Sequence, residues 1–173
     1  ITTTDSFSDL VKSLKECKEF AIALETEENH FLDTTLIGIA VSLEIGTAFY
    51  IPVGHEYEDC PDLLDAEDVL KALKPILENP FITKIGYDLK HLGHVLKNFA
   101  IDLEPVKTDV LLASYVVNSV ATKHALADIA RFYLDLSSVD PASLLGKGRT
   151  RIAPVAVVIE KYSDYAAEKA DFI

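Results

Sequence analysis

Residues 20–27 have the sequence F-A-I-A-L-E-T-E, which predicts the first strand of a sheet. Five apolar residues run directly into acids, a pattern typical of a buried strand that ends at a polar edge. Residues i and i+2 of a strand point the same way, so Glu25 and Glu27 are predicted to share one face. Two carboxylates so placed can hold a divalent metal, and a second metal ~3.5–4 Å away then needs acids from elsewhere in the chain. A polar turn after a strand would carry the same residues, so both interpretations stay open at this point.

The segments around this strand predict an α/β fold. A helix is expected before it, and two further strands follow it, joined by a hairpin turn at 44–46. Pro75 is expected to kink or end a later helix, and Asp88 is placed to cap the helix after the fourth strand. The expected strands are 20–24, 36–43, 47–53, 81–87 and the start of 106–119; the expected helices are 5–16, 65–78, 89–99, the rest of 106–119, 123–134 and 154–171. This order indicates a mixed sheet with helices on both faces.

Length and composition indicate a single folded domain, residues 1–173. The chain is 49% hydrophobic and 25% charged, which excludes a disordered chain. Sixteen basic and 28 acidic residues give a net charge of −12. A self-sufficient nucleic-acid binder usually carries a basic face, so contact with DNA would require another part of the protein, or metal ions that invert the local field. A solvated acidic surface that serves solubility is the plainer interpretation.

Cysteine usage and apolar runs suggest where the protein resides. Cys17 and Cys60 are too far apart for a zinc motif and do not form a disulfide framework, so free thiols in a reducing cytoplasm are expected. No apolar run approaches ~18 residues and no secretory leader is visible, so no membrane partner is expected. The chain contains no methionine, and its last helix reaches residues 171–173 without a capping residue. Both features predict a piece of a longer protein, and the isolated domain is expected to be a monomer.

The chain resembles, nearly end to end, the 3′–5′ exonuclease domain of bacterial DNA polymerase I. The resemblance rests on F-A-I-A-L-E-T-E (20–27), A-F-Y-I-P-V-G-H-E-Y (48–57), L-K-P-I-L-E-N (73–79), K-I-G-Y-D-L-K (84–90), T-D-V-L-L-A-S-Y-V-V-N-S-V (108–120), G-K-G (146–148) and Y-A-A-E-K-A-D (165–171). Ribonuclease D and Werner-type exonucleases are similar in fold, but Y-I-P-V, S-Y-x-x-N-S and G-K-G favour the polymerase. The resemblance implies a ribonuclease H-like exonuclease fold with about five strands, and a parent polymerase for DNA replication and repair.

Members of this family carry four metal-binding acids and a tyrosine, and the resemblance implies where these positions fall. The family motifs are D-x-E on the first strand, an aspartate four residues after an asparagine, and Y-x-x-x-D on the last helix. Aligned without gaps, the first motif places Ala23 at the aspartate and keeps the glutamate as Glu25. The second places Asp88 at the asparagine and Leu92 at the aspartate. The third keeps Tyr165 and places Lys169 at the aspartate.

The departures from this pattern predict a degenerate active site. Hard divalent cations are coordinated by several carboxylate or water oxygens. A single carboxylate does not supply these oxygens when the other positions hold an alanine, a leucine and an ammonium group. No cofactor is therefore expected. The domain is expected to be catalytically inactive and to serve as a structural platform for a polymerase domain in the same chain. Contact with DNA is expected through the parent polymerase. An alternative is an active exonuclease that binds Mg²⁺ or Mn²⁺ with a rearranged set, Glu25, Glu27 and Asp88. A stand-alone nucleic-acid binding module is disfavoured by the net charge.

The sequence also predicts what replaces the metal. An unpaired buried carboxylate is costly, so Lys169 is expected to form a salt bridge with Glu25 or with Asp88. Tyr165, one helical turn earlier, is expected to donate a hydrogen bond to the carboxylate, and Leu92 to close the pocket. In the plainer alternative, Lys169 extends to solvent and Glu25 is hydrated.

Overall fold

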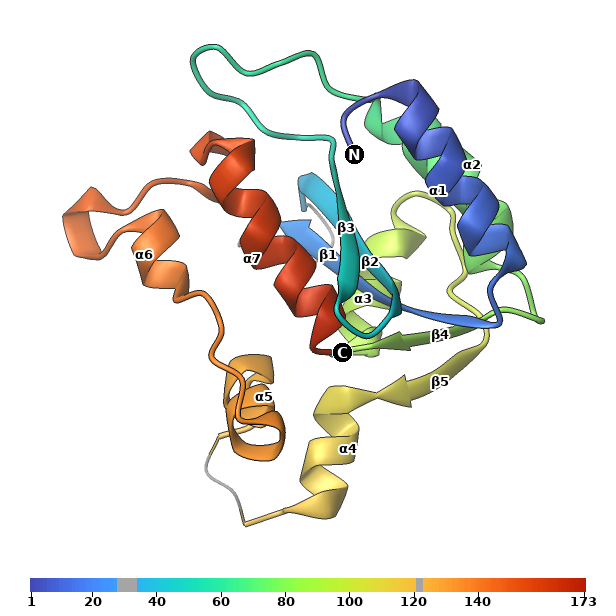
Figure 1. Cartoon of the computed structure of the whole chain (residues 1–173), viewed down its shortest axis with the longest axis vertical. Helices are drawn as coiled ribbons and strands as arrows, with labels where there is room; N and C mark the ends of the chain where they lie inside the picture. The colour runs from blue at the N-terminus through green and yellow to red at the C-terminus, as the bar shows by residue number, and fades with distance from the viewer. Residues whose placement is uncertain (28–33, 121–122) are drawn as a thin grey trace.

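A mixed five-stranded sheet forms the centre of the molecule (Figure 1). The computed structural model of the 173-residue chain describes residues 1–27, 34–120 and 123–173. The strands are β1 (Glu19–Thr26), β2 (Leu36–Glu44), β3 (Thr47–Pro52), β4 (Thr83–Gly86) and β5 (Val106–Asp109). They lie in the order β3-β2-β1-β4-β5, with β1–β2 and β2–β3 antiparallel and β1–β4 and β4–β5 parallel. The predicted α/β class and mixed sheet are confirmed.

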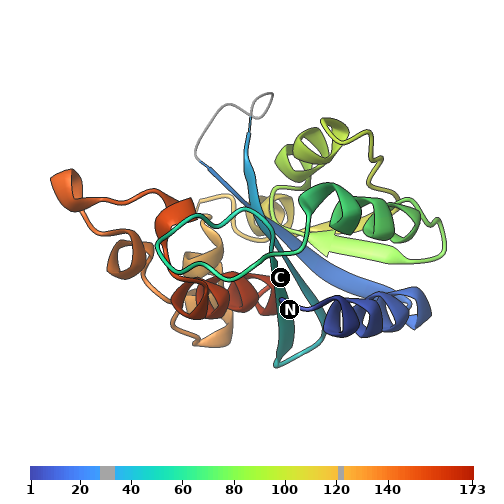
Figure 2. The same cartoon turned by 90° about the horizontal axis from the view of Figure 1, so that it is seen from above.

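Helices cover both faces of this sheet (Figure 2). They are α1 (Thr4–Glu16), α2 (Ala66–Leu77), α3 (Leu89–Lys97), α4 (Val110–Val117), α5 (Leu126–Leu134), α6 (Pro141–Leu145) and α7 (Ile159–Asp171), with short 3₁₀ turns at Gly148–Thr150 and Pro154–Ala156. The larger apolar core joins α1, α2 and α3 to one face, and α7 packs on the other. Successive residues of β1 alternate between these two layers, as a pleated strand requires: Phe20 and Ile22 enter the larger core, and Ala23 faces α7. Of the helices within the described ranges, none has the length and apolar character to cross a membrane.

The helix that contains Pro75 has nearly its predicted bounds and does not end at the proline, whereas the last helix begins later than predicted. Pro75 lies inside α2, which continues to Leu77; proline lacks an N–H, but here it withdraws only one bond from the final turn. The last helix, expected from residue 154, begins at Ile159. The carbonyls of Val155 and Val157 accept hydrogen bonds from the Glu56 N–H and the His55 ring, so they are not free to start a helix.

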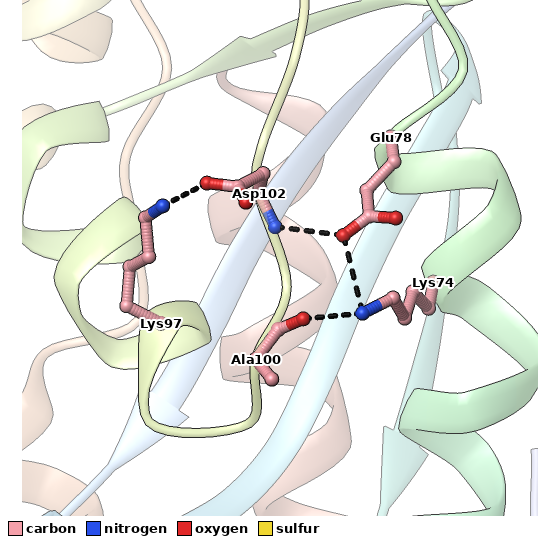
Figure 3. Close-up of polar contacts among 5 residues, drawn as sticks. All are labelled: Lys74, Glu78, Lys97, Ala100 and Asp102. Carbon is pink, nitrogen blue, oxygen red and sulfur yellow. Dashed lines mark hydrogen bonds and ion pairs between the residues drawn. The ribbon is translucent and has the colours of Figure 1, made fainter.

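Charged side chains tie the end of α2 to the loop between α3 and β5 (Figure 3). Lys74 donates to the carbonyl of Ala100, and its Nζ lies 3.4 Å from Glu78 Oε1. The same Glu78 oxygen accepts the backbone N–H of Asp102 at 3.0 Å, and Asp102 pairs with Lys97. These contacts hold the loop that leads into β5, and so support the place of β5 at the edge of the sheet.

Lys84 of β4 is fully buried and is bonded to the segments that follow α2 and precede β5. Lys84 Nζ donates to the carbonyl oxygens of Asn79 at 3.0 Å and Glu104 at 2.6 Å. Burial disfavours its charged form and lowers the pKa of Lys84 from 10.5 to about 8. The folded domain therefore releases this proton at a lower pH than the unfolded chain does.

Replacing Lys84 with methionine is expected to flatten the pH dependence of stability in mildly alkaline solution. Between pH 8 and 10.5 the unfolded chain holds the Lys84 proton more tightly, so the free energy of unfolding of the unmodified domain rises with pH, by up to about 1.4 kcal/mol per unit. Urea titrations from pH 7 to 9.5 measure this rise relative to Lys84→Met. Lys90→Met, at an exposed lysine of α3, is the matched control and should run parallel to the unmodified domain. Parallel curves for Lys84→Met as well would contradict a depressed pKa.

Candidate functional site

The end of β1 places a carboxylate under α7. Ala23 and Glu25 lie two residues apart on the face of the strand that α7 covers, and Glu25 is only 3% exposed. Glu25 pairs across the ladder with Gly38 of β2. A Cβ at Gly38 would lie 2.3 Å from the hydroxyl of Tyr50, so glycine is required here for Tyr50 to pack beside the strand.

Helix α7 supplies partners for both oxygens of Glu25. Tyr162 donates its hydroxyl to Glu25 Oε2 at 2.8 Å, and Lys169 Nζ lies 2.8 Å from Oε1. Lys169 Nζ also lies 4.6 Å from the centre of the Tyr165 ring, within range of a cation–π contact. Tyr162, Tyr165 and Lys169 are separated by three and four residues, so they lie along one side of the helix.

These contacts decide the charge states of the two α7 groups. Burial opposes the charge on Lys169, but the contacts with Glu25 and Tyr165 together outweigh burial, and the pKa of Lys169 is raised. Burial and the neighbouring Glu25 charge both raise the pKa of Tyr162, so its phenol stays protonated and remains a donor. The pair is therefore a charged lysine against a carboxylate, with a neutral phenol on the second oxygen.

A second set of buried polar groups lies beside this pair. His55, 6% exposed, has Nδ1 3.0 Å from the carbonyl oxygen of Val157 and Nε2 2.8 Å from the Tyr50 hydroxyl. Because a carbonyl only accepts, Nδ1 carries the proton and Nε2 accepts from Tyr50. Burial lowers the pKa of His55, which favours this neutral form. The His55 ring packs edge-on against Tyr162, with centroids 5.1 Å apart.

The start of α3 brings Asp88 and Leu92 toward the same place. Asp88 has a left-handed backbone (φ 53°), and its carboxylate accepts the N–H of His91 at the start of the helix. The carboxylate of Asp109, at the end of β5, accepts the N–H groups of Asp88 and Leu89 at 3.1 and 2.8 Å. Leu92 follows one turn later and is 4% exposed. Asp109 thus holds the β4–α3 turn in position.

A small pocket of about 170 Å³ remains between these elements. Its lining includes Ala23, Asp88, Leu92 and Lys169, together with His91. Glu25 is not part of this lining but is bonded to Lys169, so the structure brings together the residues at the positions that the resemblance assigns to metal ligands. The expected phenol contact differs: the hydroxyl on the Glu25 carboxylate comes from Tyr162, not Tyr165, because Tyr162 lies directly over the end of β1 while Tyr165 packs beside the Lys169 ammonium.

The remaining acids near α7 face other partners. Glu168 Oε1 accepts the backbone N–H of Val139 at 2.7 Å, and Asp171 Oδ1 accepts that of Gly46 at 2.6 Å. Glu27 lies just beyond β1, where its N–H donates to the carbonyl of Thr35. Among the residues that the structure describes, no group of three or more His, Cys, Asp or Glu side chains is arranged to hold a metal ion. With one ammonium on its carboxylate, this donor set fits an ion pair and does not fit two divalent cations.

Sequence reasoning missed three residues of the site. No contact was predicted from the sequence for Tyr162, Tyr50 or His55. For Tyr162 a signal existed, because it precedes Lys169 by seven residues, two helical turns, on the same side of the helix. For Tyr50 and His55 the sequence offered none, since their contacts with the last helix and the segment before it span about a hundred residues.

Solved structures show which fold the chain has. Trypanosoma brucei RNase D in complex with RNA U12 superposes with a TM-score of 0.77 over 100% of this chain and 58% of that one, at 16% sequence identity. RNase D of Escherichia coli, an exoribonuclease involved in structured RNA processing, superposes with a TM-score of 0.69 over 99% of this chain and 41% of that one, at 20% sequence identity. At such identities the likeness shows the fold alone, which is the ribonuclease H-like exonuclease fold that was predicted.

Sequence comparison gives the family. A family model described as 3′–5′ exonuclease matches residues 1–173. DNA polymerase I of Pseudomonas aeruginosa is 35% identical over 167 residues, which cover 95% of this chain and 18% of that protein. DNA polymerase I of Chloroflexus aurantiacus is 28% identical, over 95% of this chain and 17% of that protein. The chain belongs to the 3′–5′ exonuclease domain family of DNA polymerase I, and it spans less than a fifth of the length of these relatives.

Removing Lys169 should destabilise the domain through the carboxylate left behind. Lys169→Met is expected to lower the free energy of unfolding by about 3 kcal/mol, the low end of the range for breaking a buried pair, because a third of the lysine side chain touches solvent. Urea unfolding at pH 7 measures the loss. Lys161→Met, at an exposed lysine of the same helix, is the matched control.

The double variant Lys169→Met/Glu25→Gln separates the ion pair from packing. A neutral amide still accepts from Tyr162 and no longer needs a cation, so the double variant should be more stable than Lys169→Met alone. Strictly additive losses would mean that the two side chains do not interact energetically.

Proposed function

We propose that this chain is the exonuclease-type domain of a longer DNA polymerase I that acts in DNA replication and repair in the cytoplasm, and that the domain removes no nucleotides itself. It contributes a folded platform for the polymerase domain of the same chain, which holds the DNA. Membership of the family and the greater length of its DNA polymerase I relatives support the first part. The geometry around Glu25 supports the second.

The main support for a domain without exonuclease activity is the 2.8 Å contact between Lys169 Nζ and Glu25 Oε1. Exonucleolytic chemistry of this family's kind depends on two divalent ions held by several carboxylates. A fixed ammonium on the surviving carboxylate supplies the positive charge that the buried acid needs, and it repels an incoming cation. Ala23 and Leu92 offer no oxygen on the other sides of the pocket.

An active exonuclease with a rearranged acid set has less support. It would need Glu25, Glu27 and Asp88 to converge on Mg²⁺ or Mn²⁺. Both oxygens of Glu25 are bonded to Tyr162 and Lys169, and Asp88 caps its own helix. A stand-alone nucleic-acid binding role has less support again, because a domain of net charge −12 repels a polyanion at long range.

An oligonucleotide assay tests the proposal. The domain is expected to leave a 5′-labelled single-stranded DNA at full length in excess Mn²⁺. Stepwise shortening from the 3′ end that disappears in Glu25→Ala would overturn the proposal. Shortening that persists in that variant would come from a contaminating nuclease, and a repeat preparation without it restores the test.

Restoring the missing acids gives the converse test. The triple variant Ala23→Asp/Leu92→Asp/Lys169→Asp is expected to bind Mn²⁺ measurably by titration calorimetry, whereas the unmodified domain should not. Circular dichroism checks that the variant folds, since Leu92 is a core residue. A folded triple variant that binds no Mn²⁺ would show that these positions are not the vestiges of metal ligands.

A further inference from the structure

Helix α4 buries its hydroxyl side chain and exposes its apolar ones. Its sequence is V-L-L-A-S-Y-V-V (110–117), and of these eight residues, all of them described, Ser114 alone is buried. Leu112, Val116 and Val117 are 62%, 87% and 70% exposed. On the inner side, the hydroxyl of Ser114 lies 2.9 Å from Nδ1 of His124. A helix that packs its apolar face into its own core shows the reverse pattern, so the surroundings of α4 are incomplete within this domain.

Helix α5 extends the same exposed surface. Phe132, Tyr133 and Leu134 are 72%, 47% and 55% exposed, while small Ala130 is the buried residue. Figure 1 shows α4 and α5 next to one another at the lower end of the molecule, apart from the two cores that cover the sheet. We call the following side chains the α4–α5 face: Leu112, Tyr115, Val116, Val117, Phe132, Tyr133 and Leu134.

This concentration is unusual for the molecule. Within the described ranges, nine of the 13 large apolar residues that are exposed fall between residues 112 and 136. Single exposed apolar residues are normal, whereas a group of them marks a surface that another molecule or domain covers.

The charge around this face is also distinct. Residues 110–134, which span both helices, carry two basic side chains, Lys123 and Arg131, and one acidic side chain, Asp128, in a chain whose net charge is −12. A hollow of about 540 Å³ beside α5 is lined by Lys123, His124, Asp128, Arg131 and Phe132 among others, and Lys123 Nζ lies 3.9 Å from Asp128 Oδ1. The surface that fits here is apolar at its centre and bordered by carboxylates.

We infer that the α4–α5 face is the docking surface for the part of the polymerase chain that lies outside residues 1–173. The inference rests on the proposed function, in that it takes this domain to be part of a longer polymerase. The DNA polymerase I relatives have more than four fifths of their length outside the matched region, which supplies a covalently linked partner at high effective concentration. Four of the seven side chains of the face are aliphatic, and they favour a protein partner over a nucleic acid, because bases stack on aromatic rings, of which the face has three.

Side-chain footprinting on the full-length polymerase tests the inference, with an internal control. Photolytic carbene labelling followed by mass spectrometry reports the exposure of each aliphatic side chain. Val116 and Val117 are expected to be labelled several-fold less than Ile45, which is 99% exposed in this domain at the turn between β2 and β3. Labelling of Val116 and Val117 at the level of Ile45 would overturn the inference.

A pair of substitutions then identifies the occupant. Val116→Glu in the full-length chain should raise the labelling of Tyr115 and Phe132 several-fold, and Ile45→Glu should leave it unchanged. Protection that vanishes on dilution would assign the face to a second copy of the chain, and protection that appears only with single-stranded DNA would assign it to nucleic acid; either result overturns the inference. The oligonucleotide assay is independent of these outcomes, so an active exonuclease with a protected face would overturn the proposed function and leave the docking surface standing.

Discussion

The ion pair between Glu25 and Lys169 is the contact on which the α7 side of the structure depends. Glu25 ends β1 beneath a helix, and an acid in that position is stable only with a cation and a donor on its two oxygens. Tyr162 supplies the donor and Lys169 the cation, and both residues lie on α7, two helical turns apart. Meeting both contacts at once fixes the rotation of α7 about its own axis and its position along the strand.

The packing around the pair explains how the polar groups stay out of water. Ala40, Ala166 and Ala170 are fully buried between α7 and the sheet, and such small side chains let the helix lie close to the strands. Close approach leaves little room for solvent, so the polar groups satisfy one another. Val157, His55 and Tyr50 form one chain of hydrogen bonds, and the Tyr162 ring packs against both His55 and Tyr50.

The sheet and most helices could be predicted from the sequence because strand alternation and helical periodicity are local patterns. The meeting of Glu25 with Lys169, 144 residues apart, was predicted only through the family resemblance, which assigns both positions to one site. The sequence did not predict that Tyr162 would be the phenol on the carboxylate, since apolar periodicity counts a tyrosine as core and says nothing of its hydroxyl. It placed the start of α7 too early because the Val157 carbonyl is taken by His55, 102 residues away in the chain. Helix α4 is apolar on nearly every side, so its sequence could not show which side would face outward.

A cation built into the chain changes what this fold requires. Four clustered carboxylates repel one another and need metal ions to hold them together, whereas one carboxylate with one lysine is neutral by itself. The surroundings of β1 and α7 are then complete within the domain, with the carboxylate oxygens bonded and only a small pocket beside them. Among the described residues, exposed large apolar side chains concentrate instead on α4 and α5, on a different part of the surface. A paired carboxylate at the position where the family performs chemistry, together with exposed valine and leucine on α4, is what the proposed role of a packing module requires.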